Sequence, residues 1–528
     1  MRGSLFIVLI LALVTLSNCA RRTSISGGPK DTLAPALRNA FPKNYSTGFT
    51  GNEIKLVFDE YVKLKNINKQ LVVSPPMQTP PEISPLTASR QIIIKIQDTL
   101  LPNTTYSLNF GNSIEDNNEG NALGDFKYVF STGPIIDSLQ LSGTVKDAYD
   151  REPEALTSIV LYEANTFTDS TIYKSAPRYL TNTLENPAAY RFENLKAGKY
   201  QIAAIKDVNG NNRYDPYLDK IGFHAETVTI PNDTLYEMEL FRERKPFRAL
   251  KSQQAGGSKI LVAYEGFQEN PSVTIRDLQK ELQTYVTKVQ DKDSLHVWHE
   301  PTSSDTLTIT VRQDVYQKEF RLGIRKQKPD SLSLGLLNGA LHLRDFLKIR
   351  PSVPIARLEN SLITIKDKDS VLVPFTAEID NYNTTLHFKF EPQPVQRYTM
   401  QMLPGAVTDI FGRTTDTLKF TFATRNTSDY GNLRLTLENV KRFPVIIELA
   451  DEKGKTVLSR NAASSGPVDF QLIDPRQYYL RVIYDDSKNG RWDTGSYSER
   501  RQAEEVIYFP RLIDVRANWD VDQVFKLP

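Results

Sequence analysis

Residues 197–216 read AGKYQIAAIKDVNGNNRYDP, and residues 475–494 read PRQYYLRVIYDDSKNGRWDT. The two stretches align without a gap, so that Asp207 matches Asp485, Asn211 matches Asn489 and Asp215 matches Asp493. In each stretch an apolar and aromatic run predicts a β-strand, and the Asp, Asn and Gly residues that follow predict a tight polar turn. A strand-and-turn unit that occurs twice indicates a chain built from repeated β domains.

Strands of the same kind predominate between the signal-like start and the end of the chain. EIKLVFDEYV (53–62), RQIIIKIQD (90–98) and FKYVFST (126–132) are short, rich in β-branched or aromatic residues, and bounded by turn residues. This spacing is typical of β-sandwiches. Only IRDLQKELQTYV (275–286) has a pattern that could form a helix. The 528 residues predict three to five domains, since a domain usually has about 100–200 residues.

The first nineteen residues differ from the rest. Arg2 precedes the apolar run LFIVLILALV, and LSNC follows, ending at Cys19, which together predict a secretion signal. LSNC resembles a bacterial lipobox, in which the cysteine is acylated; Asn18 stands where that pattern prefers Gly, Ala or Ser. Cys19 is the chain's one cysteine, so an internal disulfide is excluded. The alternative is an ordinary signal peptide cut elsewhere. We expect a lipid anchor in the outer membrane. Both the periplasmic face and the cell-surface face are alternatives for its location.

Longer motifs resemble known domain families. PALRNAFPKN (35–44), IKLVFDEYV (54–62) and LLPNTTYSLNF (100–110) resemble the S-layer-type (SbsA-like) bacterial Ig-like domain, and YRFENLKAGKYQI (190–202) resembles the prealbumin-like, carboxypeptidase-regulatory sandwich. As a whole the chain resembles Ig-like lipoproteins of Bacteroidota. These resemblances imply an all-β tandem array of sandwiches. The segments are a signal peptide (1–18), a tether (19–30), an Ig-like domain (31–134), a prealbumin-like sandwich (138–245), a β-rich domain of unknown type (250–333), a second Ig-like domain (334–426) and a C-terminal prealbumin-like sandwich (427–528).

Asp followed by Ser or Thr and then Leu, Val or Thr recurs along the chain. The pattern resembles the O-glycosylation signal of Bacteroidota, which implies a glycan on the Ser or Thr. The alternative is a simple turn before a strand, because Asp readily bonds the backbone ahead of it. The candidate glycosylation residues are Thr99, Ser138, Thr234, Ser294, Thr306, Ser331, Ser370 and Thr417.

The repeated polar turns have two interpretations. Asp207, Asn209, Asn211 and Asp215 occupy positions one, three, five and nine of a calcium loop, and Asp485, Ser487, Asn489 and Asp493 do so in the second copy. At position twelve, where such a loop has a bidentate Glu, the copies have Leu218 and Ser496. We therefore expect structural turns and no required cofactor, with weak calcium binding as the alternative.

Catalytic motifs are not evident in the sequence. His296 and His299 in HVWHE would point to opposite faces of a strand, so they do not suit a shared metal. Tyr214, Tyr217 and Trp519 lie near predicted turns and either close the ends of their own sandwiches or bind a glycan or a partner.

The sequence predicts a binding or structural role. The near-neutral charge of +2, with no Lys/Arg-rich block, argues against a nucleic-acid partner. We expect a non-catalytic outer-membrane lipoprotein that acts as a structural or interaction subunit, with another envelope protein such as an outer-membrane barrel or export machine as its partner. A surface glycan-binding protein of a polysaccharide-uptake system is the alternative function.

Overall fold

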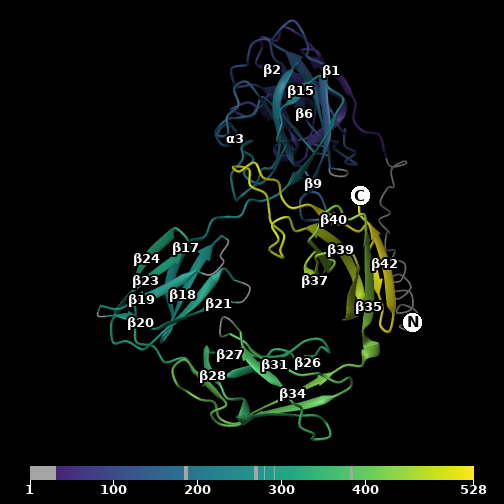
Figure 1. The fold of residues 1–528 in the computed structure, drawn as a ribbon. Coiled ribbons are helices and arrows are strands. Elements are labelled where there is room, and N and C mark those ends of the chain that lie inside the picture. The colour runs from purple at the N-terminus through teal and green to yellow at the C-terminus, as the bar shows by residue number, and fades with distance from the viewer. Residues whose placement is uncertain (1–30, 184–187, 267–270, 279, 290–291, 381–383) are drawn as a thin grey trace, which may run out of the picture.

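The structure, a computed structural model, describes residues 31–183, 188–266, 271–278, 280–289, 292–380 and 384–528. The expected signal peptide, tether and Cys19 lie outside these residues. The described residues form five β-sandwich domains in a tandem array, which confirms the all-β prediction (Figure 1). None of the helices in the described part of the chain is long and apolar enough to cross a membrane.

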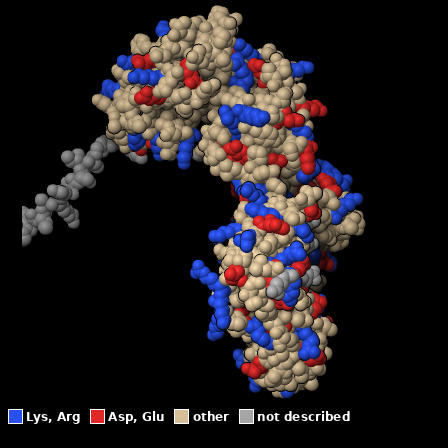
Figure 2. Space-filling view, turned by 90° about the vertical axis from the view of Figure 1, so that its left-hand side faces the viewer, with Lys and Arg blue, Asp and Glu red and all other residues tan. Residues whose placement is uncertain are grey.

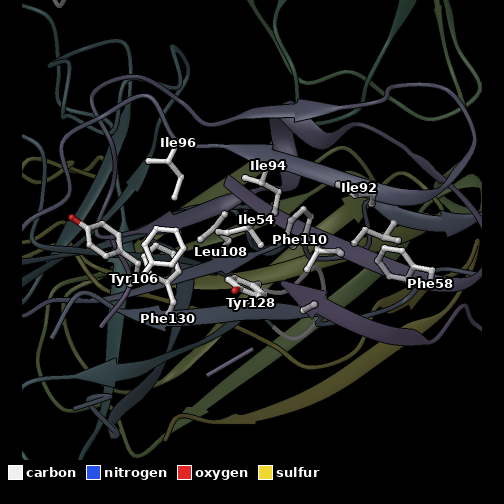
Figure 3. Packing of buried hydrophobic residues seen from close by; sticks show 14 of the residues in the cluster. Ile54, Phe58, Ile92, Ile94, Ile96, Tyr106, Leu108, Phe110, Tyr128 and Phe130 are labelled. Carbon is white, nitrogen blue, oxygen red and sulfur yellow. The ribbon is translucent and has the colours of Figure 1, made fainter. Parts of the chain in front are cut away.

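Domain 1 packs a larger sheet against a smaller one. The larger sheet has the order β1 (Leu37–Phe41), β2 (Glu53–Leu64), β5 (Ser89–Lys95), β4 (Glu82–Ser84), with β7 (Ile114–Asp116) on the end of β2; the smaller has the order β3 (Val72–Ser74), β6 (Thr105–Asn109), β8 (Lys127–Ser131). Alternate residues of β2 face inward, so Ile54, Leu56 and Phe58 are buried. Figure 3 shows Ile54 and Phe58 in the same packed layer as Phe130 from the opposite sheet.

Domains 2 and 5 have the same topology, as their sequence repeat suggests. In domain 2 the sheets are β11 (Tyr179–Asn182), β10 (Ser158–Glu163), β13 (Gly198–Lys206), β14 (Lys220–Phe223), with β15 (Val228–Ile230) also on β13, and β12 (Ala189–Leu195), β9 (Leu139–Asp147), β16 (Leu235–Leu240). In domain 5 they are β37 (Thr456–Ala462), β36 (Val445–Ala450), β39 (Arg476–Tyr484), β40 (Val506–Tyr508), with β41 (Ile513–Val515) also on β39, and β38 (Pro467–Ile473), β35 (Gly431–Glu438), β42 (Asp520–Lys526). In both domains the last strand pairs in parallel with the first, β16 with β9 and β42 with β35.

Domain 4 repeats the plan of domain 1. Its sheets are β25 (Leu334–Leu336), β27 (Leu347–Pro351), β31 (Leu386–Lys389), β30 (Thr376–Ile379), and β26 (Ala340–Leu341), β34 (Leu418–Thr424), β32 (Arg397–Met402), β29 (Ile363–Lys366). The two halves of β2 correspond to β27 and to β28 (Ile355–Leu358), which pairs with β33 (Val407–Asp409) as β2 pairs with β7.

Domain 3, the segment without a family resemblance, is a sandwich of two four-stranded sheets. Their orders are β17 (Arg248–Gly256), β18 (Lys259–Glu265), β22 (Ser294–His299), β21 (Thr284–Lys288), and β20 (Glu281–Leu282), β19 (Ser272–Arg276), β23 (Thr306–Gln313), β24 (Tyr316–Gly323). The helix considered for 275–286 is wrong, because β19, β20 and β21 occupy most of its described residues. Packing of its Thr-Tyr-Val end in a sheet contributes more favourable free energy than the helix propensity of its Leu and Glu residues.

The domains are linked in a closed circuit (Figure 1). Domain 1 packs on domain 2, where the Lys127 ammonium lies 2.9 Å from the Glu193 carboxylate. Domain 3 meets domain 4 through the rings of Trp298 and Phe411, whose centroids are 6.5 Å apart, and domain 4 meets domain 5 where Arg425 lies 4.3 Å over the Tyr430 ring. Domain 5 then returns to domain 2, and the yellow loops of domain 5 reach that domain in Figure 1. Residues far apart in sequence are therefore neighbours.

Replacing Gly143 with Ala should weaken domain 2. A Cβ at this position of β9 would collide with the Tyr236 carbonyl and with the Tyr190 hydroxyl that donates a 3.0 Å hydrogen bond to it. Overpacking of this kind costs about 1–3 kcal/mol. Hydrogen exchange in the full chain should show faster exchange of the β9, β12 and β16 amides.

Gly339→Ala is the matched control, because a Cβ there meets no atom within 4 Å. It should change the free energy of local opening by less than about 0.5 kcal/mol. Equal exchange in the two variants would show that the close approach at Gly143 does not limit the stability of domain 2.

Candidate functional site at the junction of domains 2 and 5

The first polar turn follows β13 and is closed by its own hydrogen bonds. The Asp207 carboxylate accepts the backbone N–H groups of Gly210 and Asn212, each at 2.7 Å. Asp215 accepts the side-chain amides of Asn209 at 2.7 Å and Asn211 at 2.8 Å. These contacts fold the chain tightly around its carboxylates, as expected for a structural turn.

A further carboxylate, Asp219, ties the base of the first turn, and sequence reasoning did not find it. Its two oxygens accept the backbone N–H groups of Val208 at 2.9 Å and Asp215 at 2.8 Å. Burial, with the like charges of Asp207 and Asp215, raises the pKa of the Asp219 carboxyl. The sequence feature that could have identified Asp219 is its position four residues after Asp215.

The second turn follows β39 in the same way. Asp485 accepts the backbone N–H groups of Asn489 at 3.0 Å and Gly490 at 2.9 Å. Glu504 takes the place of Asp219, accepting from the backbone N–H groups of Ser487 and Asp493, each at 2.9 Å. Burial opposes the charge on Asp493, but hydrogen bonds from Ser487 and Asn489 hold the pKa of its carboxyl below the usual range. Glu504 lies beyond an insertion, so spacing could not identify it.

Side-chain oxygens of both turns accept hydrogen bonds from backbone N–H groups of the same turn. The Asn211 and Asn489 carbonyl oxygens accept the N–H groups of Arg213 at 2.8 Å and Arg491 at 3.0 Å, while the amide nitrogens face Asp215 and Asp493. Calcium requires converging carboxylate and carbonyl oxygens. Among the described residues, no group of three or more His, Cys, Asp or Glu side chains is arranged to hold a metal ion.

Each turn places an aromatic residue at the junction between the two domains. Tyr214, seven residues after Asp207, is fully buried, and its counterpart Trp492, seven residues after Asp485, is half-buried against the same cluster. This junction cluster also contains Phe223 and Phe241 of domain 2 and Tyr497 of domain 5. The repeated turn thus orients an aromatic side chain toward the other domain in both copies.

Glu243, which follows domain 2, bridges the two domains. Its carboxylate accepts the Tyr214 hydroxyl at 2.6 Å and the backbone N–H of Tyr497 at 2.8 Å. Burial and the adjacent Glu243 charge raise the pKa of Tyr214, and burial raises the pKa of Tyr497 to about 12. Both phenols therefore remain neutral. Nearby, a Cβ at Gly495 would come within 2.5 Å of the Phe241 ring, so the domain 5 backbone lies directly against that ring.

A buried arginine forms the second part of the junction. Arg481 of β39 lies opposite Glu448 of β36, and its Nε is 2.7 Å from the Glu448 carboxylate. It also donates to the Tyr508 hydroxyl at 2.8 Å and lies 4.0 Å over the ring of Tyr149 from domain 2. Burial opposes the guanidinium charge, but these neighbours raise the Arg481 pKa above its ordinary value. Neither Arg481 nor Tyr149 was predicted, because nothing local marks a residue that pairs across domains.

The other predicted residues lie apart from the junction. Six candidate glycosylation residues are exposed: Thr99, Ser138, Thr234, Ser331, Ser370 and Thr417; Ser294 and Thr306 are half-buried. Tyr217 and Trp519 are 37% and 55% exposed but belong to different domains, and Tyr214 is buried, so the three aromatics do not form one binding row. His296 is half-buried and His299 is buried on β22, and burial lowers the pKa of both.

Comparison with known protein families finds a match for domain 1. Residues 31–132 match the family model described as a bacterial Ig-like domain. The search of curated proteins finds no match. The match agrees with the resemblance seen in the first domain and suggests a structural or interaction role.

Three solved structures show overall similarity at low scores. Domains 5–6 of the S-layer protein SbsC are 13% identical, covering 35% of this chain and 100% of that one, with a TM-score of 0.19. The Bacillus cereus major pilin BcpA is 11% identical, covering 74% and 99%, with a TM-score of 0.14. A Bacteroides ovatus mixed-linkage glucan utilization protein, SGBP-B, is 10% identical, covering 71% and 93%, with a TM-score of 0.20. Scores this low carry no argument about function.

Calcium and chelator should leave stability unchanged if the turns are closed by their own hydrogen bonds. Replacing Asp207 or Asp485 with Ala removes two hydrogen bonds to backbone N–H groups, at a net cost of about 0.5–1.5 kcal/mol for each bond. Hydrogen exchange of 207–219 and 485–504, with and without calcium, measures both effects. Slower exchange that depends on calcium would establish the calcium-loop alternative.

Truncating Trp492 and Tyr497 to Ala together should open the junction. Both side chains pack in the junction cluster and neither belongs to the core of domain 5, so the domains should stay folded. Loss of a buried aromatic side chain costs about 3–5 kcal/mol. Small-angle X-ray scattering should give a larger radius of gyration than for Trp519→Ala, an exposed control in the same domain. Unchanged scattering would mean that the other junctions alone set the arrangement.

Proposed function

We propose that this chain is a non-catalytic structural and interaction subunit of the cell envelope, anchored in the outer membrane through acylated Cys19. The observation that carries the proposal is the junction of domains 2 and 5. It closes domains 2 to 5 into one circuit through buried aromatic and ionic contacts, and domain 1 packs on domain 2 of that circuit. A fixed array presents surfaces from several domains at constant separation, which lowers the entropy lost when a partner binds.

The form of the contacts supports a scaffold. Besides the junction cluster, Arg244 lies 2.7 Å from Asp493, and the Thr494 hydroxyl donates to the Arg242 carbonyl at 2.8 Å. These bonds link the end of domain 2, just before domain 3 begins, to domain 5. Flexible arrays, in contrast, have interfaces that are small and polar.

The surface also suits a protein partner in the envelope. Figure 2 shows Lys and Arg interspersed with Asp and Glu over the face it displays, without one continuous field of a single sign. Such a surface does not favour a polyanion such as nucleic acid. The exposed Asp-Ser and Asp-Thr turns supply sites for O-glycans, which we include in the proposal for Ser138, Thr234, Ser331, Ser370 and Thr417.

Purification of the tagged full-length protein from its native outer membrane in mild detergent should recover a stoichiometric envelope protein, identified by mass spectrometry. We expect an outer-membrane barrel or a subunit of an export or assembly machine. Recovery of the lipoprotein alone would contradict the proposed role as a subunit.

The matched control is Cys19→Ser, which removes the acylated thiol. It should move the protein from the membrane fraction to the soluble fraction, because two acyl chains supply most of the membrane affinity. Absence of acyl groups on Cys19 of the wild-type protein, read by mass spectrometry, would contradict the lipid anchor; membrane association that persists in Cys19→Ser would instead indicate retention by the partner.

A further inference from the structure

A groove of about 760 Å³ lies between domains 1 and 2, and Tyr162 is shared between its lining and the junction cluster. Its domain 1 wall consists of the segment after β3 and the segment after β5, and its domain 2 wall consists of the segments on either side of α3 (Thr171–Lys174). Pro75, Pro76 and Pro177 stiffen this lining, since proline restricts the backbone. The size and the position between domains are typical of a ligand site that is already formed.

The lining offers both apolar surface and neutral polar groups. Met77, Leu100 and Leu101 contribute apolar surface, and Leu101 is 47% exposed. Among the polar side chains, Gln78, Gln97 and Thr99 are exposed, and within the described residues they make no hydrogen bond. These amide and hydroxyl groups can both donate and accept.

The charged groups of the groove are already engaged. The Asp98 carboxylate accepts the backbone N–H groups of Gln78 and Thr79, the latter at 3.1 Å. The Arg178 guanidinium lies 3.4 Å from Glu163 and 5.6 Å over the Tyr179 ring. Because the one cation in the lining faces a carboxylate, an anionic ligand would find no unpaired positive charge.

The groove also lacks the feature that an extended peptide would use. Most of its lining residues lie in segments between strands, and Tyr106, Tyr162 and Glu163 are the lining residues that belong to strands. A peptide that adds to a sheet needs the free edge of a strand for its backbone bonds. Recognition here would depend on side-chain amides and hydroxyls together with apolar contact, which matches the hydroxyl groups and C–H faces of a sugar.

We propose that the groove between domains 1 and 2 binds a neutral oligosaccharide. The amides of Gln78 and Gln97 and the Thr99 hydroxyl bind sugar hydroxyls, and Met77 and Leu101 pack against the sugar ring. The groove residues to be tested, Gln78, Gln97 and Leu101, do not belong to the junction cluster, so this proposal and the scaffold role can fail independently.

The test is direct binding of the full mature chain to a panel of neutral oligosaccharides, with uronic-acid oligosaccharides and unstructured peptides as competing classes. The double variant Gln78→Ala/Gln97→Ala should weaken binding of the neutral ligand at least tenfold, about 1.4 kcal/mol. Leu101→Trp, which fills the groove without removing a side-chain hydrogen bond, should abolish binding.

The matched control is Gln253→Ala/Gln327→Ala, which removes two exposed glutamines of domain 3 and should leave affinity unchanged. Hydrogen exchange of domains 1 and 2 verifies that the groove variants stay folded. The proposal is overturned if no neutral oligosaccharide binds, if only uronic acids or peptides bind, or if both groove variants bind as well as the control.

Discussion

The arrangement of the domains depends on a charge that domain 5 cannot satisfy alone. Arg481 is fully buried in the centre of a sheet, with Glu448, Tyr508 and Thr456 around it inside its own domain. Its remaining face is covered by Tyr149 of domain 2, whose hydroxyl accepts from the guanidinium. Removing one partner of a buried ionic group is strongly unfavourable, so separation of the domains would also require water to reach this charge. The aromatic cluster alone would be less selective, because apolar contacts have little directional preference.

The repeated Asp-Asn turn contributes to this arrangement of domains 2 and 5. Its carboxylates fold the loop so that position eight, Tyr214 in one copy and Trp492 in the other, points toward the neighbouring domain. The same local geometry therefore serves two related domains that face one another. Asp219 and Glu504 secure the base of each turn, because each accepts two backbone N–H groups.

The local sequence pattern was enough to predict the strands and the repeat. It could not predict contacts between residues that lie far apart in the sequence. Alternation in β2 and the apolar run of β13 follow from burial on one or both faces of a sheet, which a short window of sequence records. The common plan of domains 2 and 5 followed from the aligned turns. By contrast, Tyr149, Arg481 and Tyr497 carry ordinary local surroundings, and their role arises only when domain 5 returns to domain 2. The helix considered for 275–286 was wrong for a related reason. The segment has a local helical pattern, but it pairs with strands outside it to form sheets.

The parallel pairing of β42 with β35 has a consequence for the order of events in biogenesis. The three-stranded sheet of domain 5, with the order β38, β35, β42, is completed by β42 (Asp520–Lys526). Domain 5 therefore cannot finish folding until Asp520–Lys526 has been synthesised, by which time the earlier domains have had the opportunity to fold. Closure of the circuit thus follows the synthesis of β42. A chain truncated by even one strand would leave domains 1–4 linked in a row, with the aromatic surface of domain 2 exposed to solvent.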